Sequence, residues 1–169
     1  MTPIVFKPRP SSGWLTLGGI GFVLLAYSVA ILASSISANT GLGFLWPILL
    51  MVGIGAVFIF IAAWFPTMRY VLHDETLELI YGPLLRYKIP LAEIRGMRRR
   101  DLRISLISSM RLPGLALFEV TYGDVGKVKM CSTAALKGIL IIETEHGLYG
   151  ITPADEEGLV AAVRARTGK

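Results

Sequence analysis

The distribution of apolar and polar residues divides the chain into two halves of different character. Between Pro10 and Met68 there is no Asp, Glu, Lys, Arg or His, while all twelve acids and fifteen of the seventeen bases lie from Arg69 onward. Within the apolar half, residues 13–35 and 44–65 each form a continuous run of over twenty residues. A helix needs about 20 apolar residues to cross the hydrocarbon core of a bilayer. The pattern therefore predicts two membrane-spanning helices.

The segment between the two runs, "ISANTGLG", is short and rich in turn-forming residues, so it predicts a tight helical hairpin. Trp14, Trp46 and Trp64 stand near the ends of the runs, where amphipathic rings favour the membrane interface. The alternative for the first run is a cleaved signal peptide, with Lys7 and Arg9 before it. That run exceeds the core of about 7–15 residues in a signal peptide, and a second spanning run follows at once, which favours the hairpin.

The bases that flank the two runs predict the orientation of the hairpin. Lys7 and Arg9 precede the first run, Arg69 follows the second, and the segment between them carries no Lys or Arg. Because cytoplasmic loops are enriched in Lys and Arg, both chain ends are expected in the cytoplasm. The single cysteine, Cys131, agrees with this, because a lone cysteine forms no disulfide within the chain. We expect a multi-pass protein of the inner (cytoplasmic) membrane with both termini cytoplasmic, divided into an N-terminal segment (residues 1–12), the transmembrane hairpin (residues 13–65) and a cytoplasmic domain (residues 66–169).

Small residues inside the two apolar runs are candidates for close packing between helices. Glycine and alanine let the backbones of membrane helices approach one another. The motif "GGIGF" begins at Gly18, and two alanines of the same run stand four residues apart. The predicted helix-packing positions are Gly18, Gly19, Gly21, Ala26, Ala30, Gly53 and Gly55.

After Phe65 the pattern changes from continuous to alternating, which is typical of half-buried β-strands. In "LLRYKI", for example, Arg86 and Lys88 share one face while apolar residues share the other. Turns that contain Gly, Asp or Pro separate the alternating runs. We expect an antiparallel arrangement with one dry and one wet face, built from seven strands within residues 68–74, 76–81, 84–89, 115–122, 126–130, 138–144 and 148–152.

The segment "TPADEEGLVAAVRAR" near the end of the chain predicts an amphipathic helix. Thr152 suits the N-cap, Pro153 suits the first helical position, and Asp155 stands where a capping-box acid belongs. Acidic residues fill the first turn and arginines the last, which matches the direction of the helix dipole. The helix is expected to close the β domain.

The order of strands and turns in "YVLHDETLELIYGPLLRYKIPLAEI", Tyr70 to Ile94, is strand, acidic turn, strand, glycine turn, strand and "IPLAEI". Together with "SSMRLPG" and the later "GILIIETEHGLYGITPADEEGLVAAV", it resembles the bacterial pleckstrin-homology (PH-like) families over about residues 66–165. Many members carry a helical hairpin before the domain. The resemblance implies a seven-strand, partly open barrel plugged by the final helix, and no catalytic residues. The expected fold class is a membrane protein with a two-helix transmembrane hairpin followed by an α+β PH-like domain.

No group of side chains in the sequence predicts a catalytic, cofactor-binding or metal site. "HDE" at residues 73–75 and "ETEH" at residues 143–146 suit turns, and neither has the further histidines that a metal site needs. Cys131 stands alone in a strand, where a cysteine usually packs as a small core residue. "GGIGF" lies inside a predicted membrane helix, where it is not a phosphate-binding loop. We expect a protein that is not an enzyme.

Eight bases stand against two acids between Arg86 and Arg111. Nucleic-acid binders interleave bases with aromatic residues or carry them on a recognised helix, and Tyr87 is the only aromatic residue of this stretch, so no nucleic-acid partner is expected. A phosphoinositide pocket is disfavoured too, because the first turn is acidic at Asp74 and Glu75. The alternatives left open are anionic phospholipid headgroups, an acidic surface of another protein, and a solvated face that only sets topology.

The segment "DLRISLISSMRLPG", residues 101–114, is long for a connection inside a compact domain. It mixes arginines with apolar residues (Leu102, Ile104, Leu106, Ile107, Met110 and Leu112), and exposed apolar side chains among arginines favour a protein interface. We therefore expect an accessory or stabilising subunit of a larger membrane complex, such as a respiratory or photosynthetic one, that docks on other integral membrane protein subunits. The alternative is a free-standing membrane-anchored sensor or scaffold that self-assembles and contacts anionic phospholipids. The residues expected to contact the partner or lipid headgroups are Arg95, Arg98, Arg99, Arg100, Arg103, Arg111, Leu112 and Pro113.

Overall fold

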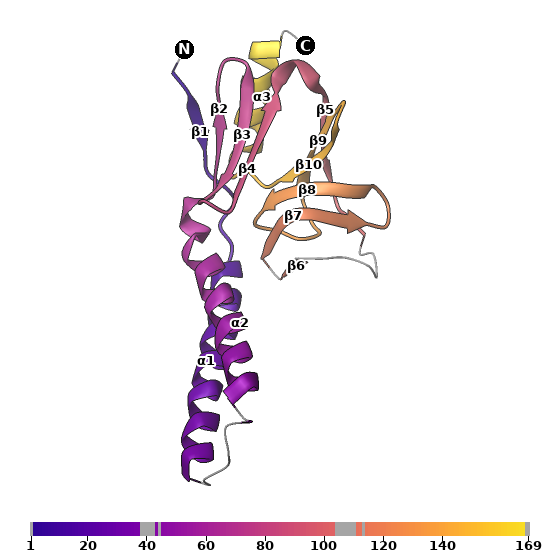
Figure 1. Ribbon diagram of the computed structural model, residues 1–169. Helices are drawn as coiled ribbons and strands as arrows, with labels where there is room; N and C mark the ends of the chain where they lie inside the picture. The colour runs from indigo at the N-terminus through magenta and orange to yellow at the C-terminus, as the bar shows by residue number, and fades with distance from the viewer. Residues whose placement is uncertain (1, 38–42, 44, 104–110, 113, 168–169) are drawn as a thin grey trace. The chain divides into compact units, whose positions relative to one another are not determined.

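The computed structural model describes residues 2–37, 43, 45–103, 111–112 and 114–167 (Figure 1). The chain forms two compact units. Trp14–Trp64 makes the helical unit, and Met1–Gly13 together with Phe65–Lys169 makes the β unit. The β unit therefore combines the segment that precedes the helices with the part of the chain that follows them.

Helices α1 (Gly13–Ser37) and α2 (Leu45–Ala63) lie where the sequence predicted two apolar helices. Both helical segments are long and apolar enough, by length and composition, to cross a bilayer. A helix suits an apolar environment because it satisfies its backbone hydrogen bonds internally. The buried hydroxyl of Ser28 is satisfied in the same way, since its Oγ donates to the carbonyl oxygen of Leu24 at 2.7 Å.

The two helices approach each other closely at two glycines. A Cβ atom placed on Gly21 would lie 2.7 Å from Ile59 Cγ1 and 2.8 Å from the carbonyl oxygen of Gly55. A Cβ atom on Gly55 would lie 3.0 Å from the carbonyl oxygen of Gly21. These positions leave no room for a side chain, so glycine permits the short separation of the two backbones.

The β unit contains two sheets, and the first has the strand order β1-β2-β3-β4 with antiparallel neighbours. Leu72, Leu77 and Ile89 are paired across β2, β3 and β4, and all three are buried. The alternate positions of these strands form the outer face of the sheet. The strands are β1 (Ile4–Phe6), β2 (Arg69–Leu72), β3 (Thr76–Tyr81) and β4 (Leu85–Pro90).

The second sheet has the strand order β5-β9-β10-β8-β7-β6. Its strands β8 and β10 run parallel, with Leu148 beside Val128. The prediction of a purely antiparallel arrangement is therefore wrong, because β10 forms a hairpin with β9 and then lies beside β8. The strands are β5 (Ile94–Arg100), β6 (Arg111–Leu112), β7 (Leu115–Tyr122), β8 (Gly126–Ser132), β9 (Ile139–Thr144) and β10 (Gly147–Ile151).

The described residues form ten strands in two sheets, whereas seven strands in one partly open barrel were expected. The pattern did not predict β1, β5 or β6. Strand β5 has no apolar alternation because it lies at an edge, where Ile94 is its one fully buried residue. Its neighbour β9 supplies the apolar side chains, since Ile139, Leu140, Ile141 and Ile142 are all buried.

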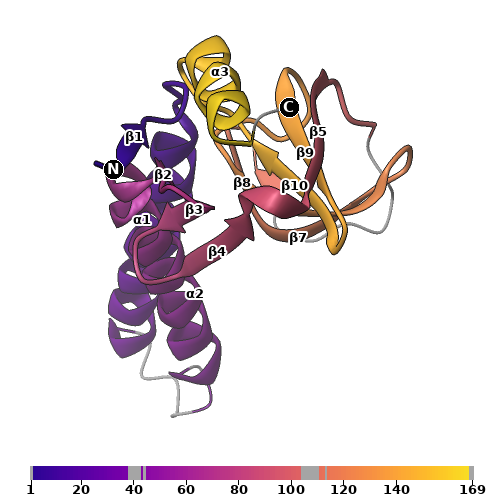
Figure 2. The same cartoon turned by 90° about the horizontal axis from the view of Figure 1, so that it is seen from above.

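Helix α3 (Glu156–Thr167) lies across the opening between the β1–β4 sheet and strands β5 and β9 (Figure 2). The helix begins later than predicted. Asp155 is its N-cap, because Asp155 Oδ1 accepts a hydrogen bond from the Gly158 N–H at 2.9 Å. Thr152, the predicted N-cap, is instead buried, and its Oγ1 accepts a hydrogen bond from the Thr133 N–H at 2.8 Å.

The N-terminal strap, which we define as residues Ile4–Ser11, is bound to the β unit along its length. Its first residues form β1, which pairs with β2. The Arg9 N–H donates to the carbonyl oxygen of Thr152 at 2.7 Å, and the Arg9 carbonyl oxygen accepts a hydrogen bond from Thr133 Oγ1 at 2.7 Å. The sequence predicted no secondary structure for this segment, so its participation in the sheet is a finding of the structure.

Candidate interaction surfaces

Strand β5 carries most of the arginines that the sequence singled out, and it lies at an edge of the six-stranded sheet. Arg98 pairs with Ile141 of β9 and Arg100 pairs with Ile139, so the two arginines lie on the same face of the sheet. Both are exposed, and neither forms an ion pair with another residue that the structure describes. Within the described part of the chain, no acidic side chain competes with an outside acidic group for these two guanidinium groups.

The other two arginines of the β5 group have acidic neighbours within the domain. Arg95 Nη2 lies 3.3 Å from Glu145 Oε1 at the exposed β9–β10 turn. Arg99 Nη1 lies 4.0 Å from Glu156 Oε2, and Arg9 Nη2 lies 3.7 Å from the same oxygen. Arg99 thus belongs to a charge cluster that joins β5, the N-terminal strap and the start of α3.

The predicted contact loop after β5 is described only in part. Arg103 is exposed, and its backbone N–H donates to Asp124 Oδ1 at 3.1 Å. Leu102, which was expected among exposed apolar side chains, is 5% exposed and packs in the core with Val120 and Ile141. For the remaining predicted contacts, Arg111 and Leu112 are described only as the backbone of β6, and residues 104–110 and Pro113 lie outside the described residues.

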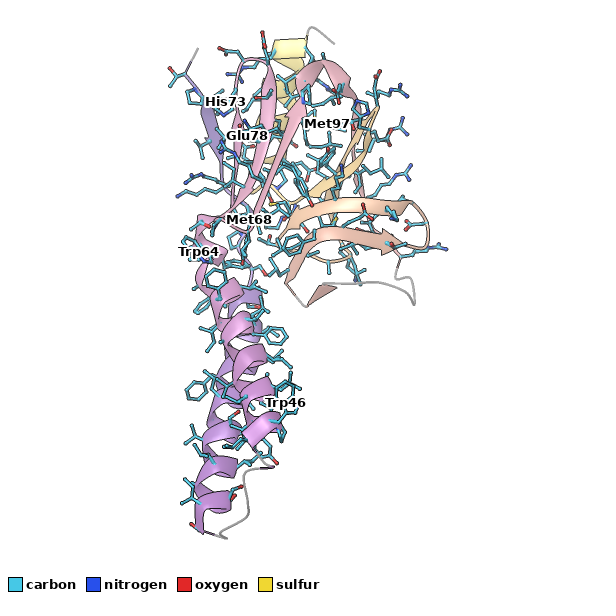
Figure 3. All side chains as sticks on the ribbon, in the orientation of Figure 1. Trp46, Trp64, Met68, His73, Glu78 and Met97 are labelled. Atoms are coloured by element: carbon cyan, nitrogen blue, oxygen red, sulfur yellow. The ribbon has the colours of Figure 1, made fainter. Side chains whose placement is uncertain are left out.

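The outer face of the four-stranded sheet holds a second group of charges, which the sequence did not single out as a site. Glu78 of β3 is only 6% exposed, and Figure 3 shows it on this sheet together with His73. Arg86 Nη2 lies 2.6 Å from Glu78 Oε2, and Lys88 Nζ lies 3.4 Å from Glu78 Oε1. The hydrogen bond from Arg86 outweighs desolvation and holds the pKa of the Glu78 carboxyl below its usual value.

Two further bases extend this outer face toward the first residue of β2. The last pair of β1 with β2 is Phe6 with Tyr70, so Lys7 follows this pair in the strap and Arg69 precedes it in β2. Arg69 in turn pairs with Ile80 of β3. Ile80 pairs with Arg86 of β4. Lys7 and Arg69 are both exposed, and neither forms an ion pair with a described residue. We call Lys7, Arg69 and Arg86 the basic row.

The chemistry of the remaining polar residues is limited. Among the residues that the structure describes, no three His, Cys, Asp or Glu side chains are grouped to hold a metal ion. Burial raises the pKa of the Cys131 thiol to about 12, so the thiol stays protonated and unreactive near neutral pH. His73 and His146 lie near single glutamates, 3.9 Å from Glu78 and 3.7 Å from Glu93.

The small residues of α1 and α2 fall into two groups. One group faces the other helix: Gly21, Gly55 and Gly18, whose Cβ position is 3.8 Å from Ala62 Cβ. The other group consists of Gly19 and Gly53, with no atom within 4 Å of a Cβ position, and the exposed residues Ala26 and Ala30. Because an α-helix turns about 100° per residue, Gly19, Ala26 and Ala30 share one side of α1, opposite Gly21.

A family model described as "Bacterial PH domain" matches residues 68–167, more than half of the chain. Comparisons with curated proteins and with solved structures found no match. The matched region runs from the start of β2 to the end of α3. The N-terminal strap and both apolar helices precede this region and are not part of the match. The resemblance inferred from Tyr70–Ile94 and the later motifs is therefore confirmed, and the chain belongs to the bacterial PH domain family.

Proposed function

We propose that this protein is a non-enzymatic accessory subunit, anchored in the inner membrane, that docks its PH domain on another integral membrane protein. PH domains are in general interaction modules for proteins or lipids rather than catalysts. In this proposal the helical hairpin is the anchor and the PH domain is the cytoplasmic docking part. The assembly is a larger membrane complex, such as a respiratory or photosynthetic one.

Two features support the anchoring and its orientation. The apolar helices expose large side chains such as Phe22 and Trp46, which an apolar environment accommodates at low free energy and water does not. The N-terminal strap and the chain after α2 belong to one folded unit, so a hairpin that spans a bilayer keeps both of its ends on the same side. Lys7, Arg9 and Arg69 flank the helices, and flanking bases favour the cytoplasmic side.

The observation that carries the docking proposal is the edge strand β5 with two arginines, Arg98 and Arg100, that form no ion pair with a described residue. The side chains of Arg98 and Arg100 lie on one face of the edge strand β5, and Arg103 is exposed just after this strand. Arginine is enriched at protein interfaces, where its guanidinium group binds carboxylates in a bidentate manner. An edge strand also presents backbone groups that a partner can bind. An acidic surface on a neighbouring subunit matches all of these groups.

The outward small residues of the hairpin support the same proposal. Gly19, Ala26 and Ala30 lie on the side of α1 opposite its contact with α2, together with the exposed Val23. Gly53 has the same position relative to Gly55 on α2, since two residues correspond to about 200° of helix rotation. Small residues of this kind let a further helix approach closely inside a membrane. The helices of a partner subunit are the natural occupants of these sides.

The test is to isolate the tagged full-length chain from membranes of its own host in a mild detergent, and to analyse it by native gel electrophoresis and mass spectrometry. We expect co-migration with a fixed set of other integral membrane subunits. Arg98→Gln combined with Arg100→Gln should weaken the association by about tenfold or more, because interface arginines often contribute about 2 kcal/mol. The doubly substituted chain should then run mainly as a smaller species.

Lys127→Gln combined with Lys129→Gln is the matched control, since it removes the same charge from β8, a strand that does not neighbour β5. This control should leave the complex intact. A chain that runs alone or as a homo-oligomer contradicts the proposal and favours the free-standing sensor or scaffold. An equal loss in both double variants contradicts the assignment of the docking surface to β5. A C-terminal reporter that is active only outside the cytoplasm contradicts the orientation.

A further inference from the structure

One end of the four-stranded sheet gathers bases on its outer face. The basic row consists of Lys7, which directly follows β1, Arg69 of β2 and Arg86 of β4, and Ile80 of β3 lies between Arg69 and Arg86. Lys7 and Arg69 have no acidic partner among the described residues. The Arg86 side chain is 60% exposed although it binds Glu78. The single carboxylate beside the row therefore leaves most of its positive charge unneutralised.

The charge changes sign along the strands of this sheet. Arg69 opens β2, whereas Asp74 and Glu75 form the turn that follows the last residue of β2, Leu72. Both acids are exposed. The turn between β3 and β4 lies at the end that carries the basic row and presents the exposed Pro83. The sheet thus has a basic end and an acidic end.

The basic end is also the end at which the chain joins the helices. Arg69 follows the last residue of α2, Ala63, by six positions, and Lys7 precedes the first residue of α1, Gly13, by six positions. Six residues span at most about 20 Å even when fully extended. The acidic turn lies about 15 Å further along β2, since a strand rises about 3.3 Å per residue. The chain therefore tethers Lys7 and Arg69 to the helix ends through a shorter connection than it does Asp74 and Glu75.

We propose that the basic row contacts the anionic phospholipid headgroups around the ends of the helices, and so fixes the orientation of the PH domain on the bilayer. The inference rests on the proposed membrane anchor but concerns a different surface from the docking edge on β5. An anionic leaflet attracts each nearby Lys or Arg, and the attraction fades within a Debye length of about 8 Å. The same field repels Asp74 and Glu75, so both ends of the sheet favour one orientation.

The test uses the full-length chain in lipid nanodiscs of phosphatidylcholine with or without phosphatidylglycerol. A donor dye is attached through Pro83→Cys at the basic end or Glu75→Cys at the acidic end, and the lipid headgroups carry the acceptor. Cys131 is buried and does not react. We expect stronger energy transfer from position 83, an increase there with phosphatidylglycerol, and its reversal by salt. Lys7→Gln with Arg69→Gln should shift the equilibrium away from contact by about 30-fold.

Arg98→Gln with Arg100→Gln is the matched control and should leave the energy transfer unchanged. Stronger transfer from position 75, or a signal at position 83 that ignores both phosphatidylglycerol and salt, overturns the proposal. An equal loss in both double variants overturns the assignment to the basic row. The nanodiscs contain no partner subunit, so failure of the docking proposal does not affect this result. A chain that does not remain with the nanodiscs contradicts the membrane anchor itself.

Discussion

Glu78 is a buried carboxylate whose charged form depends on the bases that cover it. Arg86 donates to Glu78 Oε2 from Nε at 3.1 Å and from Nη2 at 2.6 Å, which lowers the pKa of the carboxyl. Because the folded-state pKa lies below the unfolded-state value, ionised Glu78 stabilises the folded state at any pH above the unfolded-state pKa. This contribution is lost as the pH falls through the folded-state pKa. The β unit should therefore lose stability below about pH 4.

Replacing Glu78 with Gln should lower the free energy of unfolding at neutral pH by about 1–2 kcal/mol, because it removes charge-assisted hydrogen bonds. The same substitution should flatten the loss of stability in acid. Denaturant unfolding of the full-length chain in detergent, repeated across the acidic range, measures both effects. Glu119→Gln is the control, since Glu119 forms an exposed pair with Lys127 at 2.8 Å and solvent screens it. An equally large loss in the control would show that burial of Glu78 is unimportant.

At the residue scale, the sequence could predict which charged side chains are exposed better than it could predict which of them form ion pairs. Alternation placed Arg86 and Lys88 on a wet face, but the presence of Glu78 between them depends on the register of β3 with β4. For a similar reason Arg95 has an acidic neighbour, Glu145 of the β9–β10 turn, whereas Arg98 has none among the residues that the structure describes. Cross-strand registers are long-range properties, and a local pattern does not encode them.

At the scale of elements, the predictable strands were those that carry their own alternation of apolar residues. The segment "TLELIY" formed β3, and "LALFEVTY" formed β7. Strand β5, "IRGMRRR", was missed because its neighbour β9 supplies the burial. The parallel pairing of β8 with β10 was missed because it joins segments that are not adjacent in the chain. The apolar helices were predictable from length and composition alone. Gly21 and Gly55, where the helices come close, were among seven predicted packing positions, but the pattern did not distinguish them from the other five.

Gly21→Val should separate α1 from α2, because a Cβ atom there would overlap with the Gly55 carbonyl oxygen. Overpacking of this kind costs about 1–3 kcal/mol. A disulfide between Gly18→Cys and Ala62→Cys can report the separation, since the two Cβ positions lie 3.8 Å apart, a usual disulfide distance. We expect this disulfide to form readily in the otherwise unchanged chain and slowly when Gly21→Val is added.

Gly19→Val is the control for the helix crossing, because no atom lies within 4 Å of its Cβ position. It should leave the rate of disulfide formation unchanged. If Gly19→Val slows the disulfide as much as Gly21→Val does, the crossing point is not at Gly21. If the chain docks on partner subunits as proposed, Gly19→Val in native membranes should instead weaken that association, which separates packing inside the hairpin from packing outside it.

At the scale of the whole molecule, the N-terminal strap makes the PH domain discontinuous in sequence. The family match begins at residue 68, yet β1 pairs with β2, and the Ala154 N–H donates to the Lys7 carbonyl oxygen at 2.9 Å. Removal of the strap takes away the Lys7 carbonyl oxygen that accepts from the Ala154 N–H and the Arg9 carbonyl oxygen that accepts from Thr133 Oγ1. The sequence did not reveal this arrangement, because the whole hairpin separates the strap from β2.

Residues 66–169 alone should therefore fold poorly. Joining residues 2–12 to residue 66 through a flexible Gly/Ser linker, in place of the hairpin, should restore a cooperative unfolding transition. The gain over the fragment should be about 3–5 kcal/mol, because several backbone hydrogen bonds are recovered. Urea denaturation followed by circular dichroism measures it, and Thr133→Val in the linked chain should remove part of the gain. A fragment as stable as the linked chain would contradict a structural role for the strap.

During synthesis, the N-terminal strap leaves the ribosome long before the residues that it binds. Thr133 and Thr152 follow only after both helices have been made, so the strap has no access to these partners while the helices are being synthesised. If one helix crossed a bilayer and the other did not, Arg9 and Thr152 would lie on opposite sides, and the sheet could not close. With the proposed membrane anchor, the domain can therefore be completed only when both helices have been inserted together, and a wrongly inserted chain would keep an open strand edge for quality-control proteases to recognise.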